Sequence, residues 1–124
     1  MKALSVALCA FCTATALAQA ALPLEFPTEA KAVAATTLKE TLAGRTFNVA
    51  LADGSRWRLE YKANGYFFVN TSGGFNGTGD WRADDERLCT RLRGGQMSCN
   101  EVRAVGGVLF LKRDSGEVIA LKPQ

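Results

Sequence analysis

The sequence contains no histidine among its 124 residues. This absence removes the commonest general base at neutral pH, the commonest ligand of transition metals, and any Ser-His or Cys-His nucleophile pair. The acidic run Asp84-Asp85-Glu86 lacks the alternating ligand spacing of an EF-hand and is interpreted as a solvated turn. We therefore expect no metal site, no cofactor and no catalytic residues, and predict that the protein is not an enzyme.

Strong charge of either sign is also missing. The chain has 15 basic and 12 acidic residues, a formal net charge of +3 at pH 7, and this falls to +2 if Lys2 is removed with an N-terminal leader. Nucleic-acid-binding domains usually carry a much stronger basic excess. We expect no nucleic acid as a partner.

A long apolar run occurs only at the start of the sequence. Met1-Lys2 is followed by the apolar residues 3–12, and A-x-A cleavage signals follow at Ala16-Leu-Ala18 and Ala18-Gln-Ala20. The run is short for a membrane anchor. Residues 1–20 are therefore predicted to be a secretory signal peptide, which leaves no membrane span after cleavage and places the mature protein in the periplasm or outside the cell.

Cysteine is scarce once this leader is removed, because only Cys89 and Cys99 remain. A hairpin with the three-residue loop 93–95, with Gly95 in the left-handed conformation, places the two cysteines directly opposite each other. Opposed Cβ atoms lie roughly 4.5–5.5 Å apart, near the range of a disulfide. In an oxidising compartment this spacing predicts a cross-strand disulfide. The alternative is a pair of free buried thiols.

The rest of the chain divides into a lead and one domain. Residues 21–36 contain proline and many alanines and are predicted to form a flexible lead. Thr37 and Glu40 match a capping box, and Gly44 supplies a stop. These signals predict a short helix over about residues 38–43, at the start of a single domain that spans residues 37–124.

After Gly44 the pattern changes to short strands joined by glycine-containing turns. The predicted strands are Arg45–Leu51, Ser55–Tyr61, Tyr66–Asn70, Gly77–Arg82, Arg87–Leu92, Gln96–Ala104, Val108–Arg113 and Glu117–Leu121. An open sheet of this kind would expose two edges, which closure removes. We predict an all-β fold, a small antiparallel up-and-down barrel of about eight strands with one short N-terminal helix. A two-layer β-sandwich is the alternative.

Side-chain alternation identifies a candidate ligand site. Three polar residues, Thr90, Ser98 and Asn100, are predicted to point inward with the core, where polar groups need partners. They can bond to each other and to the backbone, or line a wet cavity at one end of the barrel that holds a small ligand. Phe75 lies in the glycine-rich link 71–77 and could fold over this mouth. The strand 66–70 is apolar on both faces, and alternation does not orient it.

The opposite face of the central hairpin is a candidate partner site. It carries four arginines, Arg87, Arg91, Arg93 and Arg103. Such a face is either solvated or able to meet an acidic partner. We predict that the disulfide lies on this face as an external staple, flanked by a cross-strand pair of Arg87 and Glu101.

Several short motifs resemble a known group of proteins. They are Gly44-Arg-Thr-Phe47, Asp53-Gly54, Gly65-Tyr66, Gly79-Asp-Trp81, Leu88-Cys89 and Cys99. Together they resemble small exported proteins of Gram-negative bacteria that carry a domain of unknown function. The resemblance implies a periplasmic or secreted β-rich domain and brings no known activity. The Gly-x-Trp motif is also similar to that of lipocalins and avidins, which implies a similar barrel shape.

Two functional hypotheses follow from the sequence. The first is an exported binding module for an unknown small molecule, held at the barrel mouth near Phe75, Thr90, Ser98 and Asn100. The second is a protein-interaction or inhibitor module that meets a periplasmic protein through the arginine-rich hairpin. A sizeable internal cavity favours the first hypothesis, and a filled barrel with an exposed apolar or basic patch favours the second.

Overall fold

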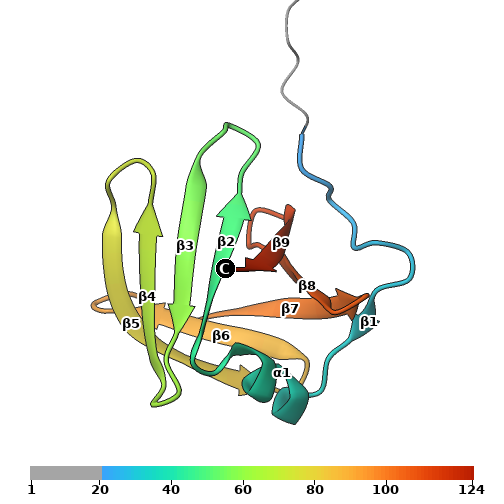
Figure 1. Ribbon diagram of the computed structural model, residues 1–124, viewed down its shortest axis with the longest axis horizontal. Helices are drawn as coiled ribbons and strands as arrows, with labels where there is room; N and C mark the ends of the chain where they lie inside the picture. The colour runs from blue at the N-terminus through green and yellow to red at the C-terminus, as the bar shows by residue number, and fades with distance from the viewer. Residues whose placement is uncertain (1–20) are drawn as a thin grey trace, which may run out of the picture.

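We describe residues 21–124 of a computed structural model (Figure 1), and the predicted signal peptide lies outside these residues. Within this range the chain forms one helix and nine strands. They are β1 (Lys31–Ala32), α1 (Ala35–Leu42), β2 (Arg45–Ala50), β3 (Arg56–Tyr61), β4 (Tyr66–Thr71), β5 (Asn76–Asp84), β6 (Arg87–Leu92), β7 (Ser98–Val105), β8 (Val108–Lys112) and β9 (Val118–Pro123). The eight predicted strands are all present, with ends shifted by at most two residues.

The strands close into an antiparallel barrel, as predicted. Each strand from β2 to β9 pairs with the next along the chain, and β9 pairs back with β2. This closure leaves eight strands without a free edge, so the sandwich alternative is not formed. The short strand β1 was not predicted. It pairs with β7 at Ala104 and Arg103. These residues follow Glu101, the last residue of β7 that is paired with β6.

The registers of the hairpins follow from their turns. The β2–β3 pairing sets Val49 opposite Trp57, and the β8–β9 pairing sets Leu109 opposite Leu121, as three-residue loops at 52–54 and 114–116 require. At the tip of the β6–β7 hairpin one prediction is wrong. Gly94, with φ of 79°, takes the left-handed conformation instead of Gly95, because a turn closes from the Leu92 carbonyl to the Gly95 amide.

The inner face of the barrel is filled with apolar side chains at the end nearer α1. Strand β4 is oriented by Phe67 and Val69, which are buried, while Tyr66 is exposed. Trp81 is also buried, and its indole N–H donates to the carbonyl of Lys62 at 2.9 Å. The fully buried side chains of largest volume are Tyr61, Phe47, Leu38, Leu42, Leu88 and Leu121.

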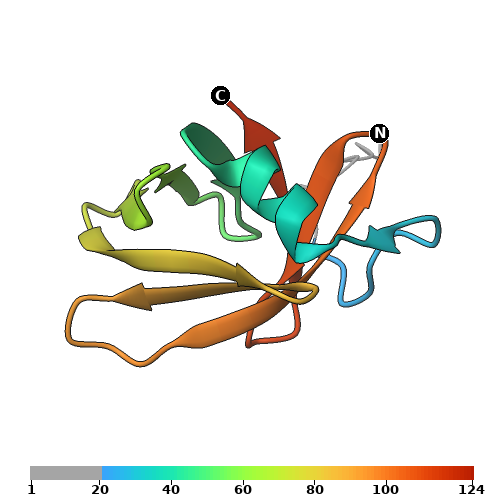
Figure 2. The same cartoon turned by 90° about the horizontal axis from the view of Figure 1, so that it is seen from below.

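Helix α1 closes this end of the barrel. Leu38 and Leu42 lie one turn apart on the same face of the helix and are both 0% exposed. Figure 2 looks at the barrel from this end and shows α1 lying across it. The predicted capping box is wrong, because the helix begins earlier, at Ala35, after an Ala34 N-cap without a side-chain hydrogen bond. Thr37 therefore lies inside the helix.

The disulfide joins Cys89 to Cys99, which face each other across β6 and β7 as predicted. It lies on the outer face, but it is not an exposed staple, since Cys89 is 0% exposed. Cys89 lies between two cross-strand neighbours, Arg82 on β5 and Cys99 on β7. Arg87 is opposed to Glu101 as predicted, yet the carboxylate of Glu101 pairs with Arg103 at 2.8 Å because that residue follows on the same face of β7.

Candidate functional site: the open mouth of the barrel

A cavity of about 350 Å³ opens at the barrel end opposite α1. In an up-and-down barrel alternate turns gather at the same end, and here they are the β2–β3, β4–β5, β6–β7 and β8–β9 turns (Figure 1). The deeper walls are apolar and include Leu59, Phe67, Val69, Leu111 and Ile119. Polar side chains lie towards the turns. The cavity is thus a pocket with an apolar interior and a polar rim.

Two glycines on β5 help to make this space. Gly77 and Gly79 occupy inner positions beside Val69 and Phe67. A Cβ on Gly77 would meet the Phe75 ring at 3.1 Å, and a Cβ on Gly79 would overlap the carbonyl oxygen of Arg91. Glycine within a strand often marks such a close approach or a bend at a barrel corner. The absence of side chains here lets β6 come close to β5 and leaves room for Phe75.

The structure brings all four predicted ligand-site residues to this cavity. Thr90 comes from β6, Ser98 and Asn100 come from β7, and Phe75 follows the β4–β5 turn. Phe75 is 54% exposed, and its amide donates to the hydroxyl oxygen of Thr71 at 3.0 Å. The link before it is shorter than predicted, because the Thr71 amide bonds to the Phe75 carbonyl and only residues 72–74 form the turn.

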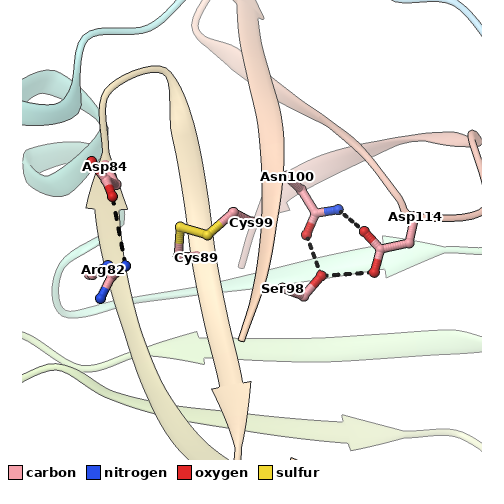
Figure 3. Close-up of a disulfide and its surroundings, with 7 residues drawn as sticks. All are labelled: Arg82, Asp84, Cys89, Ser98, Cys99, Asn100 and Asp114. Atoms are coloured by element: carbon pink, nitrogen blue, oxygen red, sulfur yellow. Dashed lines mark hydrogen bonds and ion pairs between the residues drawn. A yellow bond between two sulfur atoms is a disulfide. The ribbon is translucent and has the colours of Figure 1, made fainter. Parts of the chain in front are cut away.

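A hydrogen-bonded network joins β7 to the β8–β9 turn at the rim (Figure 3). Ser98 Oγ donates to Asp114 Oδ2 at 2.9 Å and lies 3.2 Å from Asn100 Oδ1. Asn100 Nδ2 donates to Asp114 Oδ1 at 2.8 Å and to the Lys112 carbonyl at 3.0 Å. These side chains point away from the disulfide because Cys99 lies between Ser98 and Asn100 on the strand. Ser98 and Asn100 therefore both donate to Asp114, and both line the cavity.

Tyr61 is the most deeply buried polar side chain of the cavity wall. It is 1% exposed and is surrounded by the rings of Phe47, Phe67 and Trp81 at centroid distances of 5.1–5.9 Å. Burial raises the pKa of its phenol above the ordinary value. Its hydroxyl takes part in none of the side-chain hydrogen bonds found within residues 21–124, and since no fully buried side-chain oxygen in that range lacks a partner, the hydroxyl keeps some contact with solvent. It is thus a polar group without a protein partner in the wall of an apolar pocket.

Charged groups gather around the rim. The Arg113 guanidinium lies 4.8 Å from the centre of the Trp57 ring and pairs with Glu117 at 3.1 Å. Hydrogen bonds from Ser55 hold the pKa of the Asp53 carboxyl below its usual value. Asp114 forms no ion pair within the described range. Of these charged side chains, Asp114 and Arg113 line the cavity itself.

Sequence reasoning missed Tyr61, Trp57, Arg113 and Asp114 as site residues. Tyr61 and Trp57 were placed in the predicted strand Ser55–Tyr61, Arg113 at the end of the predicted strand Val108–Arg113, and Asp114 in the turn that follows it. A usable signal was present for Asp114. The two-residue turn Gly106-Gly107 fixes the β7–β8 register, and extending that register sets Asn100 opposite Arg113, one residue from Asp114.

The four arginines of the candidate partner site do not form one patch. Arg91, which pairs with Asp80 at 3.0 Å, and Arg93 border an outer depression next to Tyr66 and Phe68. Arg87 lies near the start of α1, at the other end of the barrel. Arg103 pairs with Glu101, and its guanidinium lies 4.6 Å from the centre of the Phe26 ring.

Comparison with protein-family models, curated proteins and solved structures found no match. The resemblance to small exported proteins of Gram-negative bacteria therefore stays a prediction. Residues 21–124 contain no cluster of three or more histidine, cysteine or acidic side chains that could hold a metal ion. No helix in the same range is long and apolar enough to cross a membrane. Function is argued from the geometry of the barrel mouth.

Proposed function

We propose that this chain is an exported binding protein that holds a small, mostly apolar ligand in the mouth of the barrel. The observation that carries the proposal is the cavity of about 350 Å³, with α1 closing the far end and an apolar interior below a polar rim. Small-molecule sites are mostly apolar pockets with a few placed polar groups, from roughly 300 to 1,000 Å³. The cavity is at the small end of this range, which supports a ligand of one ring or a short chain.

Binding is proposed in preference to catalysis. The carboxylate at the rim, Asp114, is held by hydrogen bonds from Ser98 and Asn100. A nucleophile would need an adjacent base that is itself oriented by a third group. The serine hydroxyl here donates to a carboxylate that is engaged on both oxygens. This network supports a rigid rim.

Export is part of the same proposal. The disulfide fits an oxidising compartment such as the periplasm. The predicted signal peptide would leave a mature protein that begins near Gln19 or Ala21. Intact-mass measurement of the protein from its native host tests this, and a chain that keeps Met1, Cys9 and Cys12 would contradict it.

Binding can be tested with 2-phenylethanol, a neutral probe with an apolar ring and one polar end. A probe of this size is expected to bind with a Kd of about 1 mM or tighter. In a two-dimensional NMR titration, the shifted resonances should belong to cavity residues such as Thr90, Leu92 and Ile119.

A matched pair of variants makes the test specific to the cavity. Thr90→Leu adds bulk inside the pocket, whereas Thr78→Leu makes the same change on the outer face of the neighbouring strand β5. We expect Thr90→Leu to weaken binding at least fivefold and Thr78→Leu to leave the Kd unchanged. Equal affinities in the two variants, or shifts confined to the outer face, would contradict the proposal.

A second candidate function is a protein-interaction module on the outer face. Tyr66 is 60% exposed there, and with Phe68 it borders the depression that Arg91 and Arg93 also line. An acidic partner with an apolar residue would complement this surface. The Thr78→Leu variant alters this surface directly. Loss of binding to a protein partner in that variant alone would favour this alternative.

A further inference from the structure

The orientation of the Asn100 amide determines which polar group the cavity offers. Its nitrogen lies within hydrogen-bonding distance of two acceptors, the Lys112 carbonyl and Asp114 Oδ1. Only the NH₂ group can donate to both, so the amide nitrogen must face them and Oδ1 must face away from them. The amide of Asn100 therefore presents its oxygen at the rim.

The Ser98 hydroxyl does not use up this oxygen. It has one proton and two possible acceptors, Asp114 Oδ2 at 2.9 Å and Asn100 Oδ1 at 3.2 Å. Hydrogen bonds to an ionised acceptor are shorter and stronger, so the proton goes to the carboxylate. Asn100 Oδ1 is left as an acceptor without a strong donor.

The charge at the rim also favours a ligand group that donates hydrogen bonds. Asp114 lines the cavity and has only neutral donors as partners within residues 21–124. Arg113 is a cation that also lines the cavity, but its guanidinium is paired with Glu117 and lies over the Trp57 ring. Arg93, in the β6–β7 turn, lines the outer depression and not the cavity. A ligand at the rim thus meets a carboxylate and an amide oxygen, both of which accept hydrogen bonds.

The interior sets the form of the rest of the ligand. The cavity is roughly twice the size of an apolar cavity that takes up benzene, which leaves room for one ring and a short chain. Its wall is aromatic and aliphatic, and the Tyr61 hydroxyl takes part in none of the side-chain hydrogen bonds among the described residues. That hydroxyl can bond to one polar atom on the ring of a ligand.

We infer that the ligand is a small aryl-alkyl amine, with its ring in the barrel and its protonated amine at the rim between Asp114 and the amide oxygen of Asn100. This inference rests on the proposed function and names the ligand class for the same site. An ammonium group supplies three hydrogen-bond donors and a positive charge. These features complement two hydrogen-bond acceptors, one of which is a carboxylate. A carboxylate in the same position would face Asp114 and be repelled.

The test uses three probes that share a phenyl ring and differ in the polar end: 2-phenylethylamine, 2-phenylethanol and 3-phenylpropionate. Dissociation constants are measured at pH 7 by the same NMR titration. We expect the amine to bind three- to tenfold more tightly than the alcohol, and the carboxylate to bind most weakly. In Asp114→Asn the ratio of the amine and alcohol affinities should fall to about one. The control Asp84→Asn removes an exposed carboxylate elsewhere on the barrel and should preserve the ratio.

The outcomes separate the two proposals. A carboxylate that binds as tightly as the amine would overturn the ligand class and leave the binding function intact. An amine preference that survives in Asp114→Asn would overturn the assignment of the rim site. Failure of all three probes to bind would overturn the proposed function together with this inference.

Discussion

The side-chain amide of Asn100 donates a hydrogen bond of 2.8 Å to Asp114, and this bond ties strand β7 to the β8–β9 turn at the rim of the barrel mouth. The same amide reaches the backbone of Lys112 at the end of β8. One residue therefore fixes the position of the rim carboxylate relative to the cavity wall. This part of the rim is held by groups from the neighbouring strands β7 and β8 and the turn that follows β8.

Replacing Asn100 with leucine should destabilise the protein. The change removes the amide donor from the Lys112 carbonyl and from one of the two Asp114 oxygens, and losing such donors costs about 1–3 kcal/mol when the groups are sheltered from water. The control Asn48→Leu makes the same substitution at an exposed position on the outer face of β2. Urea unfolding of both variants checks this. Equal stabilities would show that the Asn100 network contributes nothing to folding.

Gly79→Ala should destabilise the barrel strongly, by about 2 kcal/mol or more, because the added methyl would overlap the Arg91 carbonyl and force β5 away from β6. The control is Gly73→Ala, where the nearest atom to the added methyl is Thr71 Oγ1 at 3.9 Å. Thermal unfolding followed by circular dichroism distinguishes the two. A Gly79→Ala variant as stable as Gly73→Ala would contradict the close packing of these strands.

Removing the disulfide should lower the melting temperature without abolishing the fold. Cys89 and Cys99 are separated by 10 residues, and closing such a loop in the unfolded chain is worth roughly 2.5–3 kcal/mol as an upper value. The double variant Cys89→Ala, Cys99→Ala and the chemically reduced wild type should melt at similar, lower temperatures. Two free thiols in protein purified from an oxidising compartment would refute the pairing.

The protein should lose stability at alkaline pH through Tyr61. The pKa of this phenol is raised in the folded state, so its contribution to stability is complete below the unfolded pKa of about 10. As the pH rises further, the unfolded chain ionises while the buried phenol stays neutral, and stability is lost. Tyr61→Phe should reduce the fall in melting temperature between about pH 8 and pH 11, and the exposed control Tyr66→Phe should not. An identical fall in both variants would argue against burial of the phenol.

Much of the fold was predictable because local turn chemistry sets the register. The loops 52–54 and 114–116 and the turn Gly106-Gly107 each fix which residues oppose each other, and the disulfide register followed in the same way. Strand β4 could not be oriented because Tyr66 and Phe68 are apolar residues on the outer face, so alternation carried no information. The predicted capping box was wrong because the N-cap residue is Ala34, which has no side chain that can cap the helix.

The candidate site was only partly predictable for a related reason. Thr90, Ser98 and Asn100 follow from alternation within a hairpin, Phe75 follows from its place in the glycine-rich link 71–77, and all four lie at the cavity. Asp114 was assigned to a turn, although extending the β7–β8 register towards that turn brings it beside Asn100. The arginines were grouped by their common face on one hairpin. Arg87 begins strand β6, whereas Arg91 and Arg93 lie at its other end, so the length of the strand separates them.

The most direct test of the central claim is to locate a bound probe inside the barrel. In the complex with 2-phenylethylamine, intermolecular nuclear Overhauser effects should connect the probe's ring protons to Thr90, Ile119 and Tyr61, which line the cavity. The methylene next to the amine should lie nearest to Asn100. Contacts confined to Tyr66 and Phe68 on the outer face would contradict the account, because they would place the binding surface outside the barrel.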